Sequence, residues 1–161
     1  MDRLIPVLIL LAVLAVLFFL MWKGWKNRQA SQTHIPEPPR PTSEPSGPGH
    51  PGMYVATTYA TDPLERINVH HLGVRTNGTL HIEDDRVVFM LDGIDGIEIP
   101  FTAIDQVTTA SGMVGKFVEK DGLVVIVWTL GDTQVATGFR PRLAHARTEI
   151  LESLALTEKV K

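Results

Sequence analysis

Residues 123–129 read LVVIVWT, and a Gly131-Asp132 turn leads from them into residues 133–139, TQVATGF. The first stretch is almost entirely apolar, which is typical of a central strand covered on both faces. The second stretch alternates apolar and polar residues, as a strand with one buried face does. Together they predict a β-hairpin at the centre of a mainly β fold.

Upstream of this hairpin, alternating apolar residues predict six further short strands. We expect them at residues 54–59, 73–76, 79–83, 86–91, 97–99 and 104–109. Asn77-Gly78 is the preferred pair for a two-residue type I′ turn, so it predicts a hairpin between the second and third of these strands. Residues 64–72 are ambiguous and could form one helical turn, and residues 111–122 are expected as a loop.

After Pro141 the apolar spacing changes to three or four residues. Leu143, Ile150, Leu151 and Leu154 then fall on one face of an amphipathic helix. Such a helix must bury its apolar face, and a bent sheet or partly open barrel leaves an end that one helix can plug. We therefore expect this helix to close the sheet, with Trp128 in or beside the core.

Three stretches of the sequence, with the helix, carry a family resemblance. They are residues 122–128 (GLVVIVW), 137–140 (TGFR) and 99–104 (IPFTAI). They resemble small actinobacterial membrane proteins that have one N-terminal membrane helix and a PH-like domain, often encoded beside pyrimidine-biosynthesis genes. The resemblance implies a PH-like bent sheet behind a membrane helix. It implies no activity, because the shared motifs are structural.

The N-terminal stretch from Leu4 to Trp22 contains no charged residue. As a helix it would span about 28 Å, close to the thickness of a bilayer core. It therefore predicts a transmembrane helix over residues 4–22, preceded by a short tail, residues 1–3. The alternative is a cleaved secretory signal, but the apolar run is long for one and no A-x-A cleavage site follows it.

The residues that follow this stretch predict how it sits in a membrane. Trp22 and Trp25 are placed where an aromatic belt meets the lipid headgroups, and Lys23, Lys26 and Arg28 add positive charge. The other flank has only Arg3, offset by Asp2, and the terminal amine. The positive-inside rule then predicts a single span of the cell membrane, with the N-terminus outside and the rest of the chain in the cytoplasm.

Residues 23–52 are expected to be a basic neck and a proline-rich linker. Seven of the eleven prolines fall within residues 27–52, which favours an extended, semi-rigid spacer. A Pro-x-x-Pro ligand over residues 36–41 is the alternative, which composition favours less. The folded domain is then predicted over residues 53–157, with a tail at residues 158–161.

Charge and composition exclude several classes of protein. The chain has 15 Lys/Arg and 18 Asp/Glu, and residues 53–161 alone hold ten against fifteen, a balance of −5. This balance argues against nucleic-acid binding and against phosphoinositide binding, since the expected early loop has Arg66 facing Asp62 and Glu65. With no cysteine, the chain has no disulfide, thiolate metal site or cysteine nucleophile.

No motif predicts an enzyme, a cofactor or a metal site. The six histidines lack a ligand spacing, and adjacent His70 and His71 would face opposite sides of a strand. The acidic clusters coincide with expected turns, where Asp is favoured by local hydrogen bonds. Residues 111–116 (SGMVGK) miss the phosphate-loop pattern at residues 110 and 117. Nucleotide hydrolysis is therefore rejected.

Two hypotheses for function follow. The first is a membrane-anchored interaction module that presents the β-domain to a protein partner of unknown identity. Its candidate partner surface is an apolar edge made by Met113, Val114 and Phe117, for which core packing is the alternative. The second is an accessory subunit of a membrane transport or envelope-export complex. Only Ala12 and Ala15 are small residues suited to helix packing in the apolar stretch.

Overall fold

The computed structural model describes residues 4–158. The chain divides into two compact units, with the boundary between His34 and Ile35. Side chains at positions 4, 28–31, 116 and 156–158 are outside this description. The first unit is one helix, and the second is a β-domain. Each unit is described by itself below.

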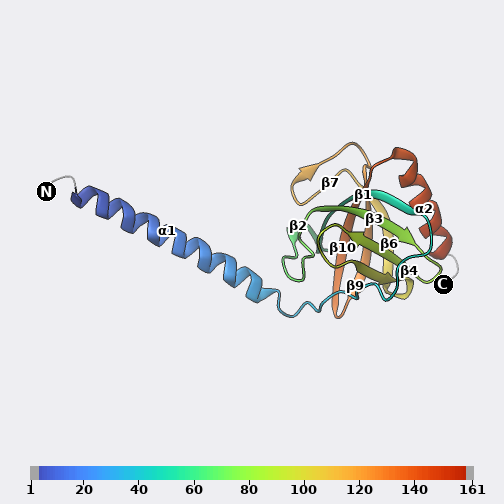
Figure 1. Ribbon diagram of the computed structural model, residues 1–161, viewed down its shortest axis with the longest axis horizontal. Helices are drawn as coiled ribbons and strands as arrows, with labels where there is room; N and C mark the ends of the chain where they lie inside the picture. The colour runs from blue at the N-terminus through green and yellow to red at the C-terminus, as the bar shows by residue number, and fades with distance from the viewer. Residues whose placement is uncertain (1–3, 159–161) are drawn as a thin grey trace. The chain divides into compact units, whose positions relative to one another are not determined.

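Helix α1 runs from Leu4 to Ser31 (Figure 1). Pro6 lies in its first turn, where a missing N–H costs no helical hydrogen bond. Its segment Ile5–Asn27 contains an 18-residue stretch with a mean hydropathy of 2.9 and is long and apolar enough to cross a membrane. The helix continues through the first residues expected as a neck, because Lys23, Lys26 and Gln29 are helix formers and no proline intervenes before Pro36.

The β-domain is built on one strongly bent antiparallel sheet in the order β5-β4-β3-β1-β10-β9-β6, with β2 paired to β1 (Figure 1). A separate small hairpin pairs β7 with β8. The bounds are β1 (Gly49–Tyr59), β2 (Asp62–Arg66), β3 (Thr76–Ile82), β4 (Arg86–Leu91), β5 (Ile97–Pro100), a 3-10 turn η1 (Phe101–Ala103), β6 (Ile104–Ala110), β7 (Gly112–Met113), β8 (Lys116–Phe117), β9 (Leu123–Leu130), β10 (Thr133–Pro141) and α2 (Ala144–Glu158). The mainly β fold with one C-terminal helix is confirmed.

The hairpin expected at residues 123–139 forms β9 and β10, and Gly131 makes the turn with a φ of 61°. The hairpin expected around Asn77-Gly78 is wrong, because both residues lie inside the continuous strand β3. A Cβ on Gly78 would lie 2.3 Å from the Met90 carbonyl oxygen. Glycine is therefore placed here by the close approach of β4, not by a turn.

Helix α2 lies against β3, β6, β9 and β10 and so spans the two halves of the bent sheet. Ile150 and Leu154 are buried in the main core, and Leu151 packs at its border. The expected burial of Leu143 is wrong, since its side chain is 48% exposed. It precedes the first helical residue and therefore does not share the buried face of α2.

The core contains a chain of buried polar groups among aromatic rings. Tyr54 packs edge-on against Phe89, and its hydroxyl lies 2.8 Å from the Leu72 carbonyl oxygen and 2.7 Å from Thr57 Oγ1. Trp128 Nε1 donates to Thr137 Oγ1, which lies 2.7 Å from Thr57 Oγ1.

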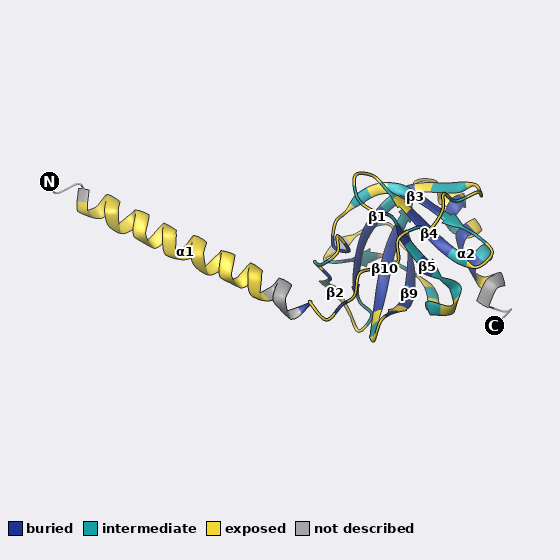
Figure 2. Ribbon diagram, turned by 60° about the horizontal axis from the view of Figure 1, so that its bottom comes forward, coloured by how far each residue is buried: buried dark blue, intermediate teal, exposed yellow. Residues whose placement is uncertain are grey.

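The two ends of this chain set its direction. Tyr54 must donate to the Leu72 carbonyl, because a carbonyl only accepts, so Thr57 donates to Tyr54 and Thr137 donates to Thr57. Burial raises the pKa of the Tyr54 hydroxyl, which keeps this donor protonated. The satisfied network fixes β1, β9 and β10 against one another, and these strands form the buried centre of the sheet (Figure 2).

Residues 35–48, called the strap from here on, run along the domain before the chain enters β1 (Figure 1). Ile35 is 1% exposed and belongs to the main core. The Pro39 carbonyl accepts the Glu98 N–H at 2.8 Å, which occupies the outer edge of β5. The proline-rich stretch expected as a spacer thus packs on the domain over these residues, while the domain boundary at residue 53 stays a prediction.

Arg86 on β4 joins the strap to the sheet. Its guanidinium is 2.7 Å from Glu83, 2.8 Å from Glu98 and 2.6 Å from the Thr42 hydroxyl. The Ser46 backbone N–H and the Arg86 side chain hold the pKa of the Glu83 carboxyl below its usual value. Glu83 therefore stays ionised at neutral pH and keeps accepting both bonds.

Candidate functional site

The residues predicted at a membrane interface lie together on the C-terminal half of α1. Trp22 and Trp25 are 53% and 57% exposed, and the Lys26 ammonium lies 4.7 Å from the centre of a Trp22 ring. This cation–π contact places a positive group next to an amphipathic aromatic ring. Lys23 is also exposed, and the Arg28 side chain is outside the described residues. The role of this group at a membrane stays a prediction.

The candidate partner surface at Met113, Val114 and Phe117 falls on the β7–β8 hairpin. Its three side chains are placed differently. Met113 is 4% exposed and packs in a second apolar cluster with Val55, Leu123, Val125 and Ala136. Val114 is half-buried, and Phe117 is 90% exposed. Met113 therefore anchors the hairpin, and Phe117 is the part that faces outward.

Two features hold this hairpin in one place. Its turn residues Val114 and Gly115 have φ values of 53° and 68°, the left-handed pair that a type I′ turn requires. This conformation is strained for a β-branched residue such as valine. The Val114 N–H donates to the Pro63 carbonyl at 2.9 Å, which ties the hairpin to the start of β2.

The residue that follows Pro63 on β2 is also apolar and exposed. Leu64 is 68% exposed, and among the described residues of the β-domain only Phe117 is a more exposed large apolar side chain. We call Leu64, Val114 and Phe117 the apolar rim. Leu64 was not predicted as part of a surface. Its signal in the sequence is a lone leucine between Asp62-Pro63 and Glu65-Arg66.

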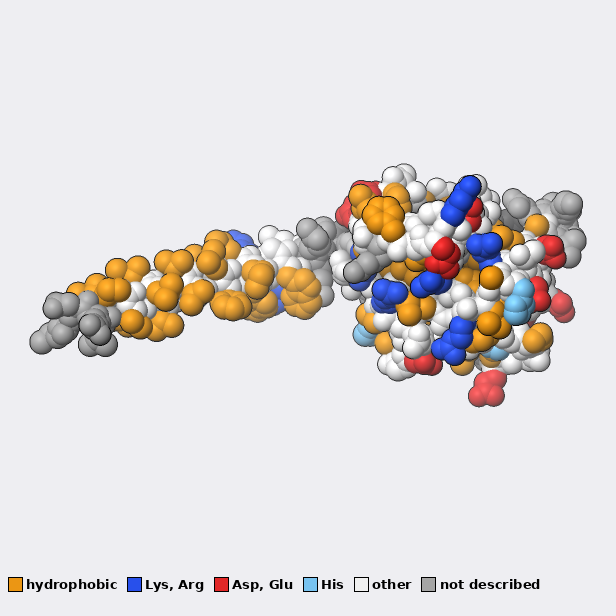
Figure 3. Space-filling view, turned by 90° about the horizontal axis from the view of Figure 1, so that it is seen from above, with side chains coloured by type: hydrophobic (Ala, Val, Ile, Leu, Met, Phe, Trp, Pro, Cys, Tyr) orange, Lys and Arg blue, Asp and Glu red, His pale blue; other side chains and the backbone are white. Residues whose placement is uncertain are grey.

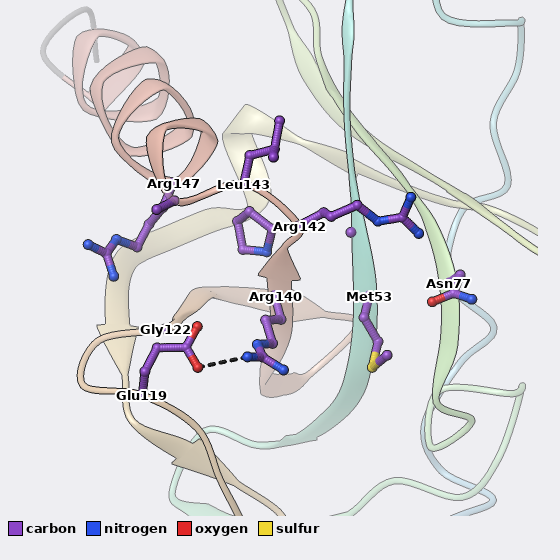
Figure 4. Close-up of a pocket in the computed structure, with 11 residues that line it drawn as sticks. Met53, Asn77, Glu119, Gly122, Arg140, Arg142, Leu143 and Arg147 are labelled. Carbon is purple, nitrogen blue, oxygen red and sulfur yellow. Dashed lines mark hydrogen bonds and ion pairs between the residues drawn. The ribbon is translucent and has the colours of Figure 1, made fainter.

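A pocket of about 420 Å³ opens beside the first turn of α2 (Figure 4). It is lined by Gly52, Met53, Asn77, Glu119, Gly122, Arg140, Pro141, Arg142, Leu143, Ala144 and Arg147. Three arginines and one glutamate thus surround one hollow. The sequence signal for it was the run of three arginines within residues 140–147, in a domain that is otherwise acidic.

The three arginines differ in their partners. Arg140 pairs with Glu119 at 2.8 Å, and Arg147 donates to the Asp121 carbonyl oxygen at 2.8 Å. The Arg142 side chain has no ion pair or hydrogen bond within the part of the chain that the structure describes. The Glu119 carboxyl accepts hydrogen bonds from the Glu119 backbone N–H and from the Arg140 guanidinium. These two bonds hold the pKa of this carboxyl below its usual value.

Two of the six histidines contact the strap. His70 Nε2 lies 3.0 Å from the Ile35 carbonyl oxygen, and His81 Nδ1 lies 3.1 Å from that of Gly47, so both contact the strap. His70 and His71 lie in a left-handed turn and not on a strand. Within residues 4–158, no group of three or more acidic or histidine side chains is arranged to hold a metal ion.

Comparison with known proteins gives one match. A family model described as "Bacterial PH domain-like" matches residues 32–155. The matched range starts just before the strap and ends within α2, so it includes the whole bent sheet. Neither the curated proteins nor the solved structures give a match.

Proposed function

Since the chain belongs to the bacterial PH domain-like family, we propose that it is a membrane-anchored interaction module that presents its β-domain to a protein partner. In this proposal α1 spans the cell membrane, the β-domain lies in the cytoplasm, and no catalytic step is assigned. The predicted actinobacterial origin belongs to the same proposal. The observation that carries it is the 90% exposure of Phe117 on a hairpin that is fixed in position.

An exposed phenylalanine gains free energy when a partner covers it, because its ring leaves water. The apolar rim is held by buried Met113 and by the bond from Val114 to Pro63, so little conformational entropy is lost on binding. Val114 has a left-handed backbone conformation that is strained for valine, and strained residues of this kind cluster at functional sites. A tether would also raise the local concentration of the domain at the membrane, so weak contacts suffice.

The strap favours the apolar rim over the β5 edge of the sheet as the contact surface. A free edge strand can pair with a strand of a partner through its unpaired N–H and C=O groups. On β5 this edge is already used, because the Glu98 N–H donates to Pro39 and the Glu98 carboxylate accepts the Thr42 N–H.

The orientation is tested with reporters fused after Lys161. The positive charges at Lys23, Lys26 and Arg28 predict that a fluorescent protein that folds only in the cytoplasm will be active there. Alkaline phosphatase at the same position should be inactive, because it requires an extracytoplasmic location. Active phosphatase with an inactive cytoplasmic reporter would place the domain outside and reverse this part of the proposal.

The contact surface is tested by photo-cross-linking in cells with a photoreactive phenylalanine at position 117. We expect a discrete cross-linked protein band from position 117 and none from position 152, since Glu152 is exposed on α2 and does not belong to the apolar rim. The same band should disappear when Leu64→Ser is added, with the melting temperature unchanged.

Two results would contradict this proposal. Equal cross-linking from positions 117 and 152 would mean that the apolar rim is not a specific contact. A specific cross-link from lipid-facing positions of α1, such as position 14, with none from position 117, would favour the accessory subunit of a transport or export complex.

A further inference from the structure

We propose that the arginine pocket, formed around Arg140, Arg142 and Arg147, binds a ligand that carries phosphate groups. This inference goes beyond the protein-partner function and does not depend on it, because the pocket and the apolar rim share no residue. It also differs from the loop over residues 62–71, whose charges argue against an anion.

The lining of the pocket has the chemistry of an anion site. Its titratable side chains are three arginines and one glutamate, a local balance of +2 in a region that carries −5 overall. Guanidinium groups bind phosphate through paired N–H donors, with geometry that a single ammonium group does not provide. The Asn77 side chain adds an amide at the same hollow.

The negative net charge of the domain does not cancel this local field. Figure 3 looks onto the end of the domain that carries β7 and the start of α2, and Lys and Arg side chains gather over the middle of that face. Glu83 and Glu98 are paired with Arg86 under the strap. Screening limits the influence of distant exposed charges to about 8 Å in physiological salt, so the nearby arginines decide the potential in the pocket.

Existing contacts hold the pocket in place without exhausting its donors. A guanidinium has five N–H donors, and the bonds of Arg140 to Glu119 and of Arg147 to the Asp121 carbonyl each use one. The Arg142 backbone N–H donates to the Pro51 carbonyl at 2.9 Å, which fixes the base of that side chain. The first turn of α2 contains no acidic residue that would repel an anion.

The spread of the arginines indicates more than one anionic group on the ligand. In Figure 4, Arg142 and Arg147 extend to opposite sides of the pocket, with Arg140 between them beside Glu119. A single phosphate contacts only part of this set. Pyrophosphate, or a phosphorylated headgroup, can reach more of it, so we expect pyrophosphate to bind more tightly than inorganic phosphate.

The test uses the full chain in neutral detergent and isothermal titration calorimetry. Inorganic phosphate and pyrophosphate represent a free ligand, and dihexanoyl phosphatidic acid below its micellar concentration represents a lipid headgroup, with dihexanoyl phosphatidylcholine as the uncharged reference. Saturable binding of pyrophosphate alone identifies a free phosphorylated ligand. Saturable binding of the phosphatidic acid but not of phosphatidylcholine identifies a headgroup. Either result supports the site, and affinity should fall as salt rises.

The arginines are tested with Arg142→Gln and with the double variant Arg142→Gln, Arg147→Gln. The Arg142 side chain makes no ion pair or hydrogen bond to the described residues, so its replacement breaks no such contact within the domain. We expect affinity to fall by about tenfold or more in the double variant, since two charge-assisted contacts are lost. Arg40→Gln is the matched control, because Arg40 lies on the strap and outside the pocket, and it pairs there with Glu37 and with Asp95 of the β4–β5 loop. Absence of saturable binding by all anionic probes, or equal affinity in the native chain, the double variant and the control, would overturn the proposal.

Discussion

A fragment that begins at Met53 is expected to be far less stable than one that begins at Ile35. The shorter fragment lacks Ile35, whose side chain is buried in the main core. Truncation of a buried isoleucine typically costs about 2–5 kcal/mol, a large part of the roughly 5–15 kcal/mol that stabilises a domain. The shorter fragment also lacks the strap partners of Glu83, Arg86 and Glu98.

The larger effect comes from β1. Its pairing with β3 has six residue pairs, from Gly49 with His81 to Tyr54 with Thr76. A start at Met53 keeps only the last two of them. Strands β3, β4 and β5 are attached to the rest of the sheet through this pairing, so they should separate together.

Circular dichroism during heating and in urea would compare residues 35–161 with residues 53–161. We expect a cooperative transition in the longer fragment and a much lower or absent transition in the shorter one. The domain boundary predicted at residue 53 instead implies that the shorter fragment folds by itself with a cooperative transition. Coincident melting curves would support that boundary and show that the strap contributes nothing measurable to stability.

The strap illustrates what composition alone does not reveal. Proline prevents a segment from forming a helix or an inner strand, and on this basis we predicted an extended backbone. An extended backbone without internal hydrogen bonds can still pack along a sheet, and its Pro39 carbonyl and Thr42 N–H remain available to the edge strand. The signal against a plain spacer was Ile35, an isolated apolar residue that only a tertiary contact could bury.

Local patterns predicted the elements that are set by their own residues. The apolar run of β9 and the turn at Gly131 were sufficient to place the central hairpin. Gly78 was misread because glycine serves both tight turns and close strand contacts, and only the neighbouring strand distinguishes these uses. The arginine pocket was missed for a related reason, since net charge averages over surfaces that the fold separates.

The second large effect is expected from α2. Ile150→Ala should lower the free energy of unfolding of the β-domain by about 2–5 kcal/mol, because a fully buried side chain leaves a cavity in the main core. Glu152→Ala on the exposed face of the same helix should change it by less than about 0.5 kcal/mol. Both substitutions leave a good helix former, so helix propensity does not account for the difference.

Urea denaturation of both variants measures these free energies, and cross-linking from position 117 provides an independent readout. Because α2 contacts β3 as well as β6 and β9, it closes the bent sheet, and its loss of packing should loosen both halves together. The Ile150→Ala variant should therefore unfold at lower urea in one transition, yet still cross-link from position 117 where it remains folded. Unchanged stability with loss of the cross-link would instead make α2 a recognition element, and the closing role of the helix would be abandoned.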